Sequence, residues 1–128
     1  MDYLCVIIGG GIGAVLRYLS SSLINSIVNT KFTFGTIFVN CVGALLIGFL
    51  INLFDTFPVN NKLKLLTITG FLGGYTTFST YSLETVQYFL NGYIKEGIIN
   101  ILVSNILCIL FVIAGMLLSK GILCTGIK

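Results

Sequence analysis

The sequence has few of the charged residues that soluble proteins place on their surfaces. Only 9% of its 128 residues are charged, against roughly 25% in a typical soluble domain. The net charge of +3 is small and the lysines of the chain are scattered. A nucleic-acid-binding protein needs a clustered basic face, so this function is disfavoured. Since 56% of the residues are hydrophobic, the composition favours a membrane protein.

Histidine is absent and the four cysteines are widely spaced. Cys5, Cys41, Cys108 and Cys124 form no C-x-x-C pair, so a zinc or iron–sulfur site is poorly supported. We interpret the cysteines as small apolar residues of helices.

A positive segment is also missing at the N-terminus, which begins Met1-Asp2-Tyr3. A secretory signal would start with such a segment, so we expect the first apolar stretch to be a retained helix. Strands that alternate apolar and polar residues are absent too, which disfavours a transmembrane β-barrel.

Four long apolar stretches account for most of the chain, near residues 3–25, 34–54, 63–90 and 97–119. Each reaches the roughly 20 residues that a membrane-spanning helix needs. The connections between them are short, which predicts antiparallel neighbours. The expected fold is an all-α membrane protein with four transmembrane helices in a single domain over residues 1–128.

The third stretch is unusual for a membrane helix. Its middle, Gly70 to Ser82, holds three glycines and several threonines and serines, which are poor helix formers. A break near residues 73–77 would free backbone carbonyls and amides, as happens at ion sites in membrane proteins. Close helix packing by small residues explains the same composition, and both readings stay open.

Positive charge hardly decides the orientation of the chain in the membrane. One side carries Lys62, Lys64, Lys120 and Lys128, and the other carries Lys31 and Lys95. This weak bias, in a chain too small to enclose much space, suggests an oligomer such as an antiparallel dimer.

Residues 9–14 match the pattern G-x-G-x-x-A after an apolar run. No acidic residue follows about 20 positions later and no βαβ unit can be assembled, so we reject a dinucleotide site. Gly9 and Gly13 fit small-residue helix packing instead.

Two polar residues stand out in the first two stretches. Arg17 lies well inside the first, where a buried arginine marks a functional site unless it reaches the membrane surface as a structural anchor. Asn40 belongs to a stripe of small residues spaced by four, completed by Thr36, Ala44 and Gly48. Its amide could donate hydrogen bonds to an anion or bridge two helices.

Aromatic and hydroxyl side chains alternate in the second half of the third stretch. Phe78 and Tyr81 share a helix face, with Ser79 and Ser82 beside them. Aromatic rings carry a positive edge, so these two rings either attract a small anion or simply pack. Glu84 follows one turn beyond Thr80, near a helix end or a polar vestibule.

The fourth stretch carries a polar track. Asn100, Ser104 and Cys108 are spaced by four, and Asn105 lies on an adjacent face.

Together these segments resemble the Fluc family of fluoride channels, also called CrcB-like proteins. The resemblance rests on the segments 9–18 (GGGIGAVLRY), 35–43 (GTIFVNCVG) and 70–82 (GFLGGYTTFSTYS). They occur in the family's order, one in each of the first three helices.

The resemblance implies an antiparallel (dual-topology) homodimer in the plasma membrane, with two fluoride pores along the subunit interface. It also implies a third helix broken near its middle, and a central structural sodium ion held by the backbone carbonyls of Gly73 and Thr76 at the breaks of both subunits. The implied function is passive, selective export of cytoplasmic fluoride, with no enzymatic activity.

The same resemblance gives roles to individual residues. Asn40 is the implied pore asparagine and Phe78 the first pore phenylalanine. The implied nearby hydroxyls belong to Ser79, Thr80 and Ser82, and Ser104 belongs to the helix-four track. Arg17 and Glu84 are implied at a vestibule or in a structural role. Tyr81 stands where the family has a second phenylalanine, so the ring edge is kept and a phenol is added.

Two other functions compete with this one. A small multidrug transporter also has four helices, but it needs a membrane-embedded carboxylate in the first helix, where only Asp2 is present at the extreme end. A structural membrane subunit without transport activity would tolerate alanine at Asn40 and Phe78.

Overall fold

The computed structural model describes residues 2–30 and 32–126, and these residues form helices and connections without a strand. Lys31 and Lys128, two of the lysines used above to weigh orientation, lie outside the described residues. Three helices are long and apolar enough to cross a membrane: α1 (Asp2–Val28), α2 (Phe34–Thr56) and α6, which is apolar over Ile94–Cys124 and ends at Gly126. The all-helical membrane fold predicted from the sequence is therefore confirmed.

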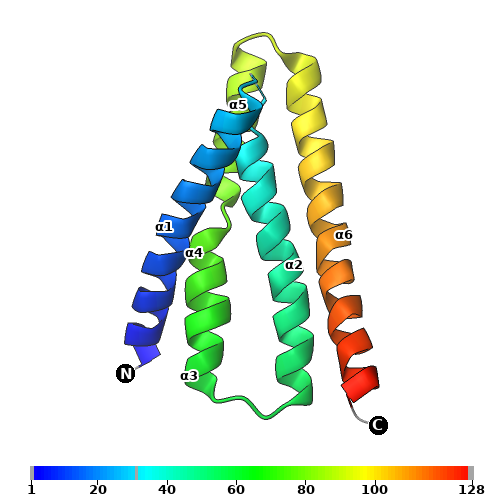
Figure 1. Ribbon diagram of the computed structural model, residues 1–128. Coiled ribbons are helices and arrows are strands. Elements are labelled where there is room, and N and C mark those ends of the chain that lie inside the picture. The colour runs from blue at the N-terminus through cyan, green and yellow to red at the C-terminus, as the bar shows by residue number, and fades with distance from the viewer. Residues whose placement is uncertain (1, 31, 127–128) are drawn as a thin grey trace.

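The remaining expected span, the third along the chain, is present as an interrupted helix. It consists of α3 (Asn61–Lys64), η1 (Leu65–Leu72), α4 (Gly73–Tyr75) and α5 (Phe78–Leu90). Figure 1 shows α3 to α4 and α5 following one another in the same direction, with α1 beside the lower half. Both termini lie at the same end of the molecule, as expected of four consecutive antiparallel passes.

The predicted break in the third pass is confirmed. Thr76 and Thr77 adopt extended backbone, with ψ angles of 158° and 114°, and α5 begins directly after them. Thr77 caps the new helix, because its hydroxyl oxygen accepts a hydrogen bond from the Thr80 N–H at 3.2 Å. Such capping favours helix initiation at this point.

The segment before the break is a π-helix over Leu65–Leu72, a wider helix that is rare and usually short. Within it, the Thr67 hydroxyl donates to the Leu63 carbonyl at 2.7 Å, a contact that loosens regular helix geometry. The sequence patterns do not predict this π-helix.

Glycines bring α1 into backbone contact with the third pass. A Cβ atom added to Gly9 would collide with the Leu66 carbonyl oxygen, and one added to Gly13 with that of Phe71. The expected small-residue packing at these glycines is confirmed, and it fixes the distance between α1 and η1.

Close contact between glycines and a neighbouring backbone also joins α2 to α6. Gly48 lies against the Val112 backbone and Gly115 against that of Leu45. This seam holds one side of α6 close to α2, which lies in the middle of the bundle (Figure 1).

Candidate functional site

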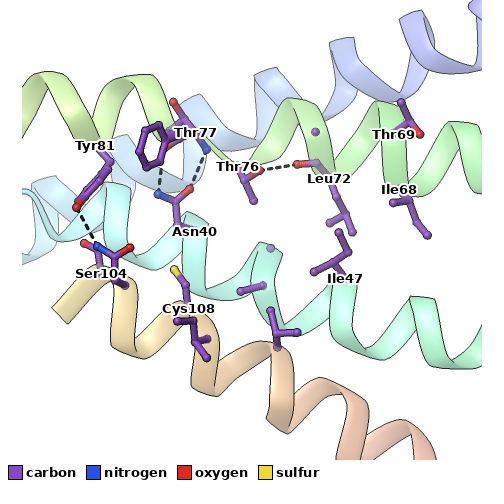
Figure 2. Close-up of a pocket in the computed structure, with 17 residues that line it drawn as sticks. Asn40, Ile47, Ile68, Thr69, Leu72, Thr76, Thr77, Tyr81, Ser104 and Cys108 are labelled. Atoms are coloured by element: carbon purple, nitrogen blue, oxygen red, sulfur yellow. Dashed lines mark hydrogen bonds between the residues drawn. The ribbon is translucent and has the colours of Figure 1, made fainter. Parts of the chain in front are cut away.

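A cavity of about 470 Å³ lies beside the break, between the third pass, α2 and α6. Figure 2 shows its lining side chains, which come from all three passes. Six of the residues to which the family resemblance gives a role line it: Asn40, Gly73, Thr76, Phe78, Tyr81 and Ser104. Thr77, Asn105 and Cys108 complete its polar and sulfur-containing surface, and its remaining lining residues are apolar, glycine or Thr69.

Asn40 holds the broken segment in place. Its Nδ2 donates to the Thr77 carbonyl at 3.0 Å, and its Oδ1 accepts from the Thr77 N–H at 2.8 Å. The two dashed lines in Figure 2 mark this pair. Because buried backbone groups without a partner are costly, the Asn40 amide replaces the helical hydrogen bonds that Thr77 has lost. One hydrogen of its NH₂ group is still available beside the cavity.

The break also changes the surroundings of the two carbonyls that the resemblance implies as sodium ligands. In an unbroken helix the Thr77 N–H would bond to the Gly73 carbonyl, but here it bonds to Asn40. The Thr76 carbonyl accepts a hydrogen bond from Arg17 Nη1 at 3.2 Å. Arg17 thus reaches inward to the break, beside a cavity of about 220 Å³ that Thr77 and Thr80 also line.

The two aromatic rings of α5 lie next to each other but differ in exposure. Their centroids are 5.4 Å apart and their planes are tilted by 49°. Tyr81 is 9% exposed, whereas Phe78 is 76% exposed. One face of Phe78 therefore has no covering in a single chain.

A chain of hydrogen bonds connects α5 to α6. Asn100 Nδ2 donates to the Thr85 hydroxyl at 2.9 Å, and the Ser104 hydroxyl donates to Asn100 Oδ1 at 3.3 Å. Asn105 Nδ2 donates to the Tyr81 hydroxyl at 3.0 Å. Asn100 and Ser104 of the polar track expected in the fourth stretch are thus buried in the protein, and Asn100 is bonded to α5.

Comparison with known proteins places this arrangement in a family. The sequence model of the CrcB-like proteins, described as Camphor Resistance (CrcB), matches residues 4–116, which include all of the side chains described above. The chain belongs to the CrcB-like family.

Individual relatives match the CrcB-like chain over nearly its whole length. The protein named fluoride-specific ion channel FluC of Ruminiclostridium cellulolyticum is 44% identical over 115 residues, covering 89% of this chain and 88% of the relative. The one of Hydrogenobaculum sp. is 45% identical over 119 residues, covering 92% and 97%. The one of Legionella pneumophila (strain Lens) is 41% identical over 122 residues, covering 94% and 91%.

These matches confirm the family resemblance drawn from the three sequence segments. Together with the long apolar helices, they make the chain a multi-pass membrane protein. The relatives are named as ion channels and not as enzymes, in agreement with the expectation that this CrcB-like chain has no enzymatic role.

The serine and threonine residues of α5 lie outside the large cavity that Asn40 and the aromatic rings line. Thr80 lines the smaller cavity beside Arg17. Ser79 contacts the Thr77 hydroxyl at 3.3 Å, and Ser82 donates to the Phe78 carbonyl at 2.9 Å. Neither serine is among the residues that line the large cavity of this CrcB-like chain.

Glu84 lies apart from the large cavity, at one of about 290 Å³ that Gln87, Tyr88 and Glu96 also line. Its Oε1 accepts a hydrogen bond from the Thr36 hydroxyl at 2.7 Å. Its Oε2 is buried, and no hydrogen-bond partner for it is found among the described residues. The placement is compatible with the vestibule role, which stays a prediction.

Two residues of the site received no role in the sequence analysis. Thr77 carries the backbone groups that Asn40 binds, and the available signal for it was a threonine at a suspected helix start, where threonine is a favoured cap residue. Asn105 was noticed only as a polar residue on a neighbouring face. Its contact with Tyr81 depends on how α5 and α6 are rotated, which spacing alone does not give.

Proposed function

We propose that two copies of this chain form a fluoride-selective channel in the cell membrane, through which cytoplasmic fluoride leaves passively. The names of the relatives support the choice of ion. The observation that carries the proposal is the cavity beside the break, whose described lining holds amide, hydroxyl and aromatic groups and no charged side chain.

Such a lining suits a small, strongly hydrated anion. A narrow pore must replace the hydration shell of the ion by other donors and still release the ion. The free hydrogen of the Asn40 amide and the ring edges of Phe78 and Tyr81 are weak, distributed partners of this kind. Because the described lining residues carry no fixed positive charge, the pore would not simply concentrate every anion.

The exposure of Phe78 supports a dimer. A pore residue must be surrounded by protein, yet 76% of the Phe78 side chain is uncovered in one chain. A second, antiparallel copy packed against this face would complete the wall and would create two equivalent pores, since a symmetric pair uses the same surface twice.

A central sodium ion fits the chemistry of the break. Freed backbone carbonyls are the usual sodium ligands at broken membrane helices, and Gly73 and Thr76 would supply one pair from each subunit. The role of the ion would be structural, holding the two breaks together. The Thr76 carbonyl oxygen already accepts a hydrogen bond from Arg17, so the ion would share that oxygen with a guanidinium group.

The direct test is ion efflux from liposomes that contain the purified protein. The liposomes are loaded with potassium fluoride or potassium chloride. Valinomycin is then added so that K⁺ can leave together with the anion and no opposing voltage builds up. The proposal predicts rapid release of fluoride, followed with an electrode, and no release of chloride above protein-free liposomes. A well-folded dimer that releases neither ion, or both equally, would rule out a fluoride-selective channel.

A further inference from the structure

Asn105 on α6 makes two contacts through its side-chain nitrogen. Its Nδ2 lies 2.7 Å from the Ile101 carbonyl oxygen and 3.0 Å from the Tyr81 hydroxyl. In Figure 2 the dashed line from the Tyr81 hydroxyl runs to α6 at the edge of the cavity.

The Ile101 contact determines which way the amide faces. A backbone carbonyl can only accept a hydrogen bond, so the amide atom beside it must be the nitrogen. The NH₂ group has two hydrogens, one for Ile101 and one for Tyr81. In the second bond the Tyr81 oxygen is therefore the acceptor.

A phenol that accepts at its oxygen still has its own hydrogen to donate. Among the described residues, no acceptor for the Tyr81 hydrogen is found. Tyr81 is a buried residue that lines the cavity together with Asn40 and Ser104. Buried donors normally have a partner, which makes an occupant of the cavity the natural acceptor.

The neighbouring hydroxyl groups are differently engaged. The Thr76 hydroxyl donates to the Leu72 carbonyl at 3.0 Å, the Thr77 hydroxyl donates to that of Thr80 at 2.9 Å, and the Ser104 hydroxyl donates to Asn100 at 3.3 Å. Thr69, the remaining hydroxyl residue of the lining, lies at the opposite end of the cavity from Tyr81 (Figure 2). Near the pair of hydrogen bonds between Asn40 and Thr77, the hydroxyl hydrogen without an acceptor in the described part of the chain is therefore that of Tyr81.

We propose that the Tyr81 hydroxyl donates a hydrogen bond directly to the permeating anion, and that Asn105 positions it for this purpose. This proposal rests on the proposed channel function and adds a specificity-determining residue to it. The phenol is then a strong donor in addition to the ring edge of the same side chain. Fluoride accepts hydrogen bonds more strongly than chloride, so such a donor favours fluoride.

The test compares Tyr81→Phe with the unmodified protein in the liposome assay over a range of fluoride concentrations. The half-saturating fluoride concentration is expected to rise about tenfold, which corresponds to about 1.4 kcal/mol, and the preference for fluoride over chloride to fall. Tyr75→Phe is the matched control, because the Tyr75 hydroxyl contacts Ser20 at 3.4 Å and does not line the cavity. It should leave both quantities unchanged.

Asn105→Leu tests the positioning role without introducing a charge. It should shift both quantities in the same direction as Tyr81→Phe but by less, because the phenol then loses its fixed orientation. In Tyr81→Phe protein the same substitution should add nothing, since non-additivity reveals residues that act together. Asn105→Asp is a second variant: its carboxylate would accept the Tyr81 hydrogen and should abolish the donor's contribution altogether.

The outcomes separate this proposal from the channel function. If the unmodified protein conducts fluoride and Tyr81→Phe keeps its half-saturation and selectivity, the donor role is overturned while the channel stands. If the effects of Tyr81→Phe and Asn105→Leu simply add, the positioning role is overturned. Absence of fluoride efflux from the unmodified protein would instead count against the proposed function itself.

Discussion

At the scale of single residues, Asn40 determines whether the broken pass keeps its shape. Replacement by alanine removes both partners of the Thr77 backbone, and each unpaired buried group costs about 1–3 kcal/mol. We expect Asn40→Ala to reduce fluoride efflux at least tenfold, a change of about 1.4 kcal/mol or more. The measurement is the initial rate of efflux from liposomes that contain equal amounts of protein.

Asn52 provides the control for this experiment. It is an asparagine on the same helix, α2, and its amide reaches the Met116 carbonyl only at 3.5 Å. Asn52→Ala should conduct fluoride like the unmodified protein. Equal rates for the Asn40 and Asn52 variants would show that the hydrogen bonds between Asn40 and the Thr77 backbone are dispensable for conduction.

Arg17 gives a second prediction at this scale, because its guanidinium lies 3.2 Å from an oxygen proposed to bind sodium. Two like charges 4 Å apart repel by about 1 kcal/mol even in water. Arg17→Gln removes the charge and keeps a donor, so the sodium concentration that half-stabilises the protein against heat should fall about fivefold or more.

The sodium experiment needs a control for the loss of one positive charge. Lys62→Gln serves this purpose, since Lys62 is exposed at the start of the third pass and should leave the sodium response unchanged. A thermal stability that is independent of sodium in the unmodified protein would contradict the proposed ion site.

At the scale of secondary-structure elements, contact between α1 and the third pass depends on particular glycines. A Cβ atom at Gly13 would collide with the Phe71 backbone, whereas at Gly11 it would meet nothing within 4 Å. Gly13→Ala should therefore destabilise the protein by about 1–3 kcal/mol, and Gly11→Ala should be neutral or slightly stabilising. Thermal unfolding in detergent measures both, and a similar loss in the two variants would refute the packing argument.

The elements themselves were partly predictable from the sequence. The four spans and the break at Thr76 and Thr77 followed from apolar length and poor helix formers. The π-helix over Leu65–Leu72 did not, because its apolar residues satisfy an ordinary helix as well and its wider bonding depends on tertiary packing.

The site was predictable to a similar degree. Family resemblance and residue type pointed to Asn40, Phe78 and Ser104, which line one cavity. The bonds from Asn40 to Thr77 and from Asn105 to Tyr81 join separate passes of the chain. No local pattern encodes such contacts, because they depend on the rotation of each helix about its own axis.

At the scale of the whole molecule, the weak charge bias predicts insertion in both orientations. A chain with its four cysteines replaced and Pro58→Cys introduced has a single thiol in the connection after α2. An impermeant maleimide added to intact cells should label about half of the molecules, and the rest only after permeabilisation. Complete labelling, or none, before permeabilisation would contradict dual topology.

The break in the third pass also has an electrical consequence. The peptide dipoles of an unbroken transmembrane helix sum to roughly half an elementary charge at each end, both ends being in water. Here one helical segment ends at Tyr75 and the next begins at Phe78, so a negative and a positive helix end both lie inside the bundle. Poor dielectric screening strengthens both fields there. An uncharged stretch of backbone can thus favour a cation on one side and an anion on the other, while the described residues that line the large cavity include no ionised side chain.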